Sequence, residues 1–236
     1  MNRSDGSDAV EDRTTEISAS WDSNAEAWAK AVRTGAIGSR RAGTDAAILA
    51  AIRRSRGRRV LDVGCGEGWL ARAIASDGFA VTGIDGSAAL VERARAAGGG
   101  RFEVMTYDAF SAHPASVGGP FDIAVLNFAL LAELISPLLG AVRQCLAPGG
   151  MLLIQTLHPV EVSRGEPYLD GWRVETFGSL EGFAHPMPWY FRTLASWTRE
   201  MAGAGFFIER IDEPEDPSAG RPLSVLFTAV PRSART

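Results

Sequence analysis

A regular alternation of apolar runs and helical patterns between residues 58 and 157 restricts the possible folds of this chain more than any other feature. Apolar runs that read as buried strands cover residues 58–65, 80–85, 101–107, 121–127 and 151–157. Helices are predicted between them at 68–77, 87–97 and about 133–146, and before them at 24–33 and 44–55. Apolar strands that alternate with helices are typical of a parallel sheet covered on both faces. Because crossovers between parallel strands are right-handed, the pattern predicts a doubly wound α/β sheet.

The last part of the chain breaks this alternation. After a helix at about 193–203, two apolar runs at 206–213 and 223–230 are joined only by the loop EPEDPSAGRP. That link is too short for a helical crossover, so these two strands are predicted to be antiparallel. The expected sheet therefore has seven strands, of which six are parallel and the last is reversed.

The segment 158–192 has no clear periodicity and is rich in aromatic side chains, namely Trp172, Phe177, Phe183, Trp189 and Tyr190. Loops at the end of such a sheet often carry binding residues. One interpretation is a substrate-side insertion that acts as a lid over an apolar or aromatic substrate. The other is an ordinary packed connection.

Composition excludes several classes of protein. Residues 1–16 are polar and lack the apolar core of a signal peptide, so residues 1–18 are predicted to be a disordered tail before a single domain at 19–236. The net charge of −4 and the absence of a basic stripe argue against a nucleic-acid partner. No apolar run reaches the ~18–20 residues that span a bilayer. Cys65 and Cys145 form no CxxC pair and have no metal-like spacing, which favours a reduced, cytoplasmic setting.

A glycine loop follows the first strand of the alternation, in the sequence LDVGCGEGWL at 61–70. Gly64 and Gly66 let the backbone turn sharply and approach a ligand closely. The spacing is GxGxG, and Trp69 stands where a dinucleotide-binding loop has its third glycine. Asp62 would repel a pyrophosphate, but it suits a ligand with a positive charge. The loop therefore favours a cationic nucleoside over a dinucleotide.

Two aspartates follow the next two strands. Asp85 ends the second strand and can accept hydrogen bonds from both hydroxyls of a ribose. The alternative is that Asp85 caps the next helix, a position for which Ser87 competes. Asp108, in the sequence YDAF, can accept a hydrogen bond from an adenine amino group, or it is an ordinary loop aspartate.

The motifs VLDVGCGEGWLARAIASDGFAVTGID, YDAF, FDIAVLNFALL and LAPGGMLLIQTLHP, taken in this order, resemble class I S-adenosylmethionine-dependent methyltransferases. The most similar group is that of the small-molecule enzymes of ubiquinone and menaquinone biosynthesis, and the resemblance covers about residues 20–230. It implies a seven-stranded sheet with the last strand reversed, and S-adenosyl-L-methionine as cofactor. Matched by position, the implied cofactor-binding residues are Asp62, Gly64, Cys65 and Gly66 at the methionine part, Asp85 and Gly86 near the ribose, Asp108 and Ala109 at the adenine, and Asn127 and Phe128 at the methyl-donor cleft. Asp122 lies at the opposite end of its strand and is interpreted as structural.

Three further residues are candidates with open alternatives. Trp28, together with Trp21, closes over the cofactor as N-terminal helices do in similar enzymes, or it is simply part of the core. Arg40 can pair with the cofactor carboxylate. His158, just past the fifth strand, is a general base for a hydroxyl acceptor or a loop histidine held by Pro159.

The function predicted from these features is methyl transfer to a small-molecule acceptor at oxygen, nitrogen or carbon. The sequence NFAL follows the fourth strand, where methyltransferases of planar amines usually carry an Asn/Asp-Pro-Pro-Tyr-like tetrapeptide. A protein or RNA methyltransferase and a catalytically inactive cofactor-binding partner are the alternatives.

Overall fold

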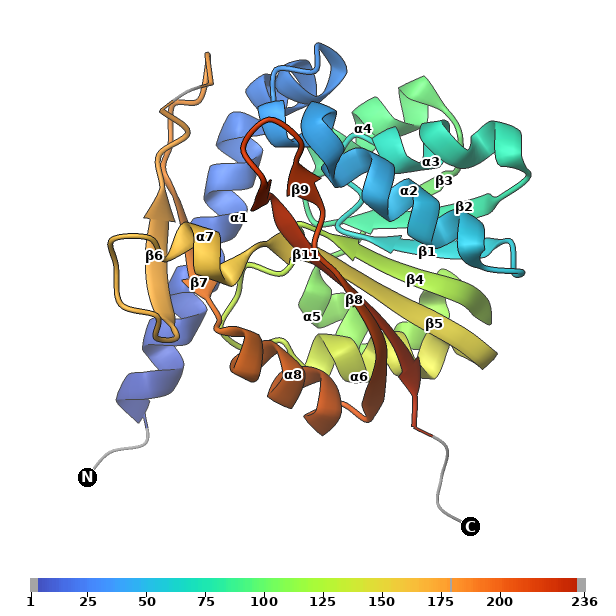
Figure 1. The fold of residues 1–236 in the computed structure, drawn as a ribbon. Helices are drawn as coiled ribbons and strands as arrows, with labels where there is room; N and C mark the ends of the chain where they lie inside the picture. The colour runs from blue at the N-terminus through green and yellow to red at the C-terminus, as the bar shows by residue number, and fades with distance from the viewer. Residues whose placement is uncertain (1–3, 179, 233–236) are drawn as a thin grey trace.

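The computed structural model describes residues 4–178 and 180–232 and is built around a seven-stranded sheet of order β3-β2-β1-β4-β5-β11-β8 (Figure 1). Six strands run in one direction, and β11 is antiparallel to both of its neighbours. The predicted reversal of the last strand is therefore confirmed. The strands are β1 (Arg59–Val63), β2 (Ala80–Asp85), β3 (Arg101–Val104), β4 (Phe121–Asn127), β5 (Leu146–Leu157), β8 (Phe206–Asp212) and β11 (Ser224–Pro231).

Helices cover both faces of this sheet, as the alternation of apolar strands predicts (Figure 1). One face packs on α2 (Asp45–Arg54), α3 (Trp69–Ile74) and α4 (Ala88–Ala97). The other packs on α5 (Tyr107–Ala112), α6 (Ser136–Cys145) and α8 (Leu194–Gly203). Short turns complete the layers at η1 (Arg40–Thr44), η2 (Ala75–Asp77) and η3 (Pro114–Val117). Each fully buried aliphatic or aromatic side chain contributes roughly 1.5–3 kcal/mol, so these two apolar layers hold the sheet in place.

The first helix, α1 (Ser4–Arg33), is much longer than the predicted helix at 24–33. The prediction of a disordered tail at 1–18 is wrong from residue 4 onward, and residues 1–3 lie outside the described part of the chain. Ala25 and Ala29 of α1 pack against Leu90 of α4, and Ile17 is buried as well. These contacts are supplied by distant segments, so the local polarity of residues 1–16 did not reveal them.

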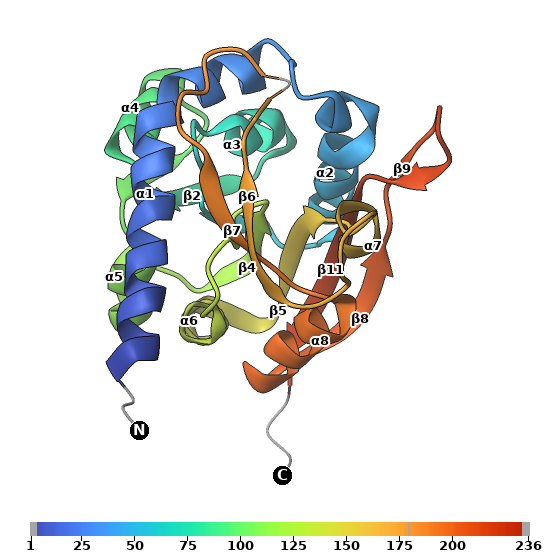
Figure 2. The same cartoon turned by 90° about the vertical axis from the view of Figure 1, so that its left-hand side faces the viewer.

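The segment 158–192 also has more regular structure than its sequence indicates. It contains α7 (Pro159–Val162) and an antiparallel hairpin of β6 (Gly171–Glu175) and β7 (Met187–Phe191). Pro188 lies opposite Val174 in the two-stranded hairpin, where a strand tolerates proline because one of its edges is unpaired. Figure 2 shows α1 and this hairpin in front of the edge at which the parallel strands end. A second small hairpin, β9 (Glu215–Asp216) and β10 (Arg221–Pro222), joins β8 to β11.

Two predicted element boundaries are corrected by the structure. The third strand ends at Val104, because the Thr106 hydroxyl accepts a hydrogen bond from the Ala109 N–H at 3.2 Å and begins α5. The fifth strand begins at Leu146, ahead of the predicted start at Met151, with a shift of register against β4.

Candidate functional site

The glycine loop between β1 and α3 is the centre of the candidate site. Gly64 and Gly66 have φ angles of +79° and +55°, a region that residues with side chains rarely adopt. A Cβ atom on Gly64 would lie 2.6 Å from the Ala129 Cβ and 2.6 Å from the Tyr107 hydroxyl. The loop therefore needs glycine both for its conformation and for the close approach of α5 and the loop after β4.

The carboxylate of Asp85 connects β2 to this loop. Its two oxygens accept hydrogen bonds from the backbone N–H groups of Gly66 and Ser87, each at 2.9 Å. The structure thus brings Asp85 to the glycine loop and also to the start of α4, while the binding of a ribose by Asp85 stays a prediction. Gly86, between the two bonded residues, is exposed. Each carboxylate oxygen has lone pairs left for further donors.

The second acidic residue, Asp62, is only 2% exposed. Burial, and then the nearby charge of Asp85, raises the pKa of Asp62 to about 7. Burial likewise raises the pKa of Asp85, and the hydrogen bonds from Ser87 and Gly66 oppose that shift. Two desolvated carboxyl groups close together favour a cationic ligand, because a nearby positive charge stabilises the ionised form of Asp62 and opposes the shift.

The side chain of Cys65 packs in the apolar core. Cys65 is buried in the core beside α2, α3 and α4, and its backbone N–H donates to the Ile84 carbonyl at 3.0 Å. Burial raises the pKa of this thiol above its ordinary value. Cys65 therefore shapes the loop with its backbone, and its side chain is part of the core.

On α5, the predicted residues Asp108 and Ala109 are exposed in the first turn. Sequence analysis missed their neighbour Tyr107, whose hydroxyl donates to the Ala129 carbonyl at 3.0 Å. Burial, followed by the charge of Asp85, raises the pKa of Tyr107 well above its usual range. The sequence signal that could have located it is the capping residue Thr106, which begins a helix just before it.

The residues at the end of β4 and directly after it form another wall of the candidate site. Phe128 has a φ of +53°, and its N–H donates to the Gln155 carbonyl of β5 at 2.8 Å. Such a conformation in a bulky residue is strained and is found most often at functional sites. Within the described residues, the Asn127 Oδ1 and Ser87 Oγ atoms are buried and form no hydrogen bond. Unpaired buried polar atoms cost about 1–3 kcal/mol each, a cost that a polar ligand here would remove.

Trp28 of α1 lies over the glycine loop. A Cβ atom on Gly66 would lie 3.9 Å from the Trp28 Nε1 atom. Trp28 packs edge-on against Trp21 at 5.0 Å between ring centroids and against Phe183 at 6.3 Å. Trp28 therefore joins the glycine loop to an aromatic cluster that includes residues of the 158–192 segment.

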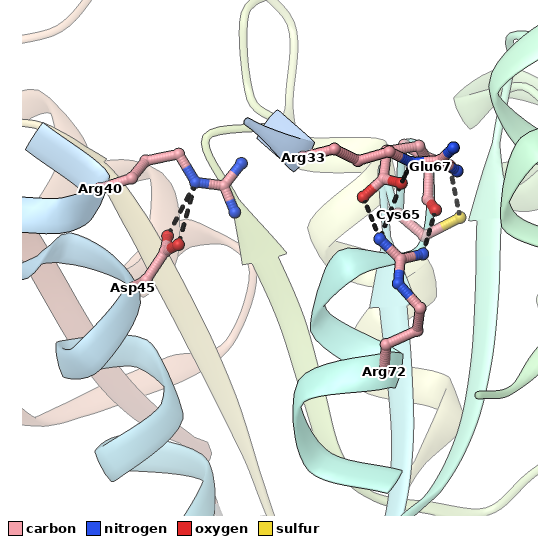
Figure 3. A network of polar contacts seen from close by, with 7 residues as sticks. Arg33, Arg40, Asp45, Cys65, Glu67 and Arg72 are labelled. Atoms are coloured by element: carbon pink, nitrogen blue, oxygen red, sulfur yellow. Dashed lines mark hydrogen bonds and ion pairs between the residues drawn. The ribbon is translucent and has the colours of Figure 1, made fainter. Parts of the chain in front are cut away.

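Figure 3 shows the charged side chains around this loop in two separate groups. Arg40 donates to both carboxylate oxygens of Asp45, at 2.9 and 3.1 Å, and lies 4.2 Å from the Trp69 ring centroid. Glu67, inside the glycine loop, has a fully buried side chain that pairs with Arg33 at 2.8 Å and with Arg72 at 2.5 Å. The charge of Arg40 is thus already balanced by Asp45, and its role at the cofactor carboxylate stays a prediction.

His158 lies beyond the end of β5 and is 3% exposed. Its Nε2 atom is 2.7 Å from the Oε1 atom of Glu213, which follows β8. Glu213 was not identified from the sequence, because 55 residues separate the two positions along the chain. Asp122, at the far end of β4, accepts hydrogen bonds from the Arg58 and Arg59 N–H groups at 2.8 and 2.9 Å, which agrees with its interpretation as structural.

The doubly wound sheet, the glycine loop and the acidic strand ends together define a class I S-adenosylmethionine-dependent methyltransferase. Residues 38–211 match the family model of a methyltransferase domain, and the chain belongs to that family. S-adenosyl-L-methionine is its cofactor, and the buried carboxyl groups and unpaired polar atoms of the site fit this ligand, which carries both a positive charge and hydroxyl donors.

Individual relatives agree with this assignment. The chain is 33% identical over 106 residues to a ubiquinone biosynthesis O-methyltransferase from Caulobacter sp. (strain K31), a match over 43% of this chain and 42% of that protein. The match thus spans less than half the length of this relative. A crystal structure of an S-adenosylmethionine-dependent methyltransferase from Mesorhizobium loti superposes with a TM-score of 0.57 at 27% identity, over 77% of this chain and 95% of that one. The glycopeptide N-methyltransferase MtfA, in complex with (S)-adenosyl-L-methionine, has the same fold, with a TM-score of 0.61 at 20% identity over 80% of this chain and 93% of that one.

Proposed function

We propose that this enzyme transfers the methyl group of S-adenosyl-L-methionine to an oxygen atom of a small, largely aromatic or apolar acceptor. The observation that carries the proposal is the aromatic β6–β7 hairpin, which lies over the strand ends beside the glycine loop (Figure 2). The similarity to a ubiquinone biosynthesis O-methyltransferase favours oxygen over nitrogen or carbon as the accepting atom.

Contacts between the hairpin and the loop after β4 support an acceptor pocket at this place. Arg192, directly after β7, donates to the carbonyl oxygens of Ala132 at 2.7 Å and Glu133 at 2.5 Å. Trp172 of β6 donates from Nε1 to the Glu133 carboxylate at 3.2 Å and packs edge-on against Tyr190. The same loop follows Asn127, the last residue of β4, and begins with Phe128. The aromatic hairpin is therefore hydrogen-bonded to the loop that forms a wall of the proposed methyl-donor cleft.

The proposed cofactor contacts follow the placement of the side chains. Asp62 attracts the ammonium group of the methionine part, Asp85 accepts from the ribose hydroxyls, and Asp108 accepts from the adenine amino group. The backbone of Gly64 and Gly66 gives the ligand room to approach, and Trp28 covers it from α1. The bound cofactor supplies a methyl group on a good leaving group, so the protein mainly aligns the acceptor and excludes water. His158 is proposed as the base that takes the acceptor proton.

Replacing Asp85 by alanine is expected to weaken cofactor binding by ~1.5–3 kcal/mol, the usual contribution of hydrogen bonds to a charged group. Titration calorimetry with S-adenosyl-L-methionine measures this change. Asp122→Ala is the matched control, because Asp122 also accepts two backbone N–H bonds but lies at the other end of the sheet. Equal affinities of the Asp85 variant and the wild type would refute the ribose assignment.

Cofactor affinity is expected to rise with pH up to about 7, where the Asp62 carboxyl loses its proton. The pKa of Asp62 in the folded protein lies above the ordinary value of 3.8. The protonated carboxyl therefore stabilises the free enzyme at low pH, and this contribution to folding stability is lost as pH rises through about 7. The cationic cofactor binds the ionised form, so below pH 7 its affinity should fall about tenfold per pH unit. Calorimetry in buffers of different ionisation enthalpy counts the released proton. Asp62→Asn should bind more weakly and without this slope; an unchanged slope in the variant would show that another group titrates.

A screen of metabolite pools with a methyl-labelled cofactor tests the acceptor class directly. We expect label on a small aromatic or apolar product, attached through oxygen and identified by mass spectrometry. Label found only on protein or RNA would overturn the proposal, although the net charge of −4 speaks against RNA.

No helix within the described residues is long and apolar enough to cross a membrane. A cytoplasmic location is proposed together with this function, since both cysteines are free thiols.

A further inference from the structure

The contact between His158 and Glu213 joins the end of β5 to the link that follows β8. Glu213 lies in the link between β8 and β9, and its carboxylate is 2.7 Å from the Nε2 atom of the buried His158 ring. The Glu213 side chain is 54% exposed and is therefore in contact with water. The other ring nitrogen, Nδ1, is buried and forms no hydrogen bond with any described residue.

This geometry determines which ring nitrogen carries the proton when the histidine is neutral. An ionised carboxylate can only accept hydrogen bonds, so the bonded Nε2 atom must be the donor. Nδ1 then holds the free lone pair and is the atom that can accept a proton. A base whose tautomer and orientation are set by a carboxylate is a recurring arrangement in proton-transfer sites.

We propose that Glu213 is a positioning residue, which holds His158 with its proton on Nε2 and so leaves Nδ1 as the base for the acceptor hydroxyl. This inference rests on the proposed function, in which the acceptor is a hydroxyl group that loses its proton on methylation. The acceptor O–H gives its proton to Nδ1, and the oxygen electron pair forms the bond to the methyl carbon. The carbon–sulfur bond breaks with its electrons on sulfur. The carboxylate of Glu213 stabilises the positive charge that the ring acquires.

Other charged groups near this pair are already balanced by partners. Glu161 on α7 pairs with Arg164 at 2.7 Å and lies 4.0 Å from Arg221 of β10. Asp212, just before Glu213, pairs with Arg210 and Arg54. Among the described carboxylates, the one bonded to the His158 ring is therefore that of Glu213.

The activity test compares Glu213→Gln with Glu215→Gln, a variant that makes the same charge change two residues away on exposed β9. With the oxygen acceptor found by the labelled-methyl screen, Glu213→Gln should lower kcat about 10–100-fold. The KM for the acceptor and the affinity for the cofactor should stay within twofold of wild type. Glu213→Asp should recover part of the rate. Equal kcat values for the two Gln variants would overturn the proposal.

Nitrogen NMR of the free enzyme gives a readout that needs no acceptor. The chain has three histidines, so the His158 signal can be assigned with a His158→Gln variant. We expect the proton on Nε2 in the wild type, and a mixture of tautomers in Glu213→Gln. A proton on Nδ1 in the wild type would overturn the positioning role, whatever the acceptor. A proton on Nε2 in an enzyme that methylates only carbon or nitrogen would overturn the oxygen-acceptor function and leave the Glu213–His158 contact supported.

Discussion

Replacing Gly64 by alanine is expected to reduce cofactor affinity at least ~100-fold and to destabilise the fold by several kcal/mol. The φ angle of +79° costs a residue with a Cβ atom about 1–2 kcal/mol. The new atom would also lie 2.6 Å from both the Ala129 Cβ and the Tyr107 hydroxyl, far inside van der Waals contact. The loop must therefore separate from α5 and from the loop after β4, which form two walls of the proposed cofactor site. Urea unfolding and titration calorimetry measure the two effects.

Gly78→Ala separates the steric part of this effect from the conformational part. Gly78 has nearly the same φ, +78°, but a Cβ atom there would meet nothing within 4 Å. This control should lose about 1–2 kcal/mol of stability and keep its cofactor affinity. If Gly64→Ala behaved like Gly78→Ala in both measurements, the close approach at the glycine loop would have no role in binding.

Replacing His158 by alanine is expected to reduce turnover by ~10²-fold or more, the usual contribution of a general base. Cofactor affinity should change little, because His158 contacts Glu213, whereas the glycine loop is held by its hydrogen bond to Asp85. The measurement is single-turnover methyl transfer to the identified acceptor, at a temperature where both proteins are folded. Removal of a buried ring also leaves a cavity, so unfolding is followed in parallel.

His185→Ala is the control for this second experiment. His185 lies in the same 158–192 segment, and its hydrogen bonds with Asn24 use its backbone N–H and carbonyl. This variant should therefore keep both its fold and its turnover. Full activity of His158→Ala would make His158 a structural residue, as its alternative interpretation states.

The order of elements could be predicted from the sequence because it depends on local patterns. The runs at 80–85 and 121–127 are strands with the predicted bounds, since a buried parallel strand is apolar along its whole length. The antiparallel last strand followed from the short link after Glu213. Four candidate site residues could be predicted because the loop and the strand ends lie within a short stretch of chain, namely Asp62, Gly64, Gly66 and Asp85.

Predictions failed where the deciding contacts are distant in sequence. α1 extends back to Ser4 because its later turns pack on α4 and β7, although residues 1–16 show no apolar period. Tyr107 was assigned to a strand, and only the contact with Ala129 reveals its place beside the glycine loop. The β6–β7 hairpin was missed because its aromatic residues show no simple alternation.

The sequence by itself determined the fold class and the reversed last strand, which depend on local periodicity and on the length of one link. It also indicated the cofactor, through an ordered set of motifs that resembles a known family. Only the tertiary structure decided which side chains share a site. It gave the buried Asp62 its pKa of about 7, paired Arg40 with Asp45, and placed Glu213 against His158. Such properties depend on burial and on partners brought from other parts of the chain, and no local pattern specifies either.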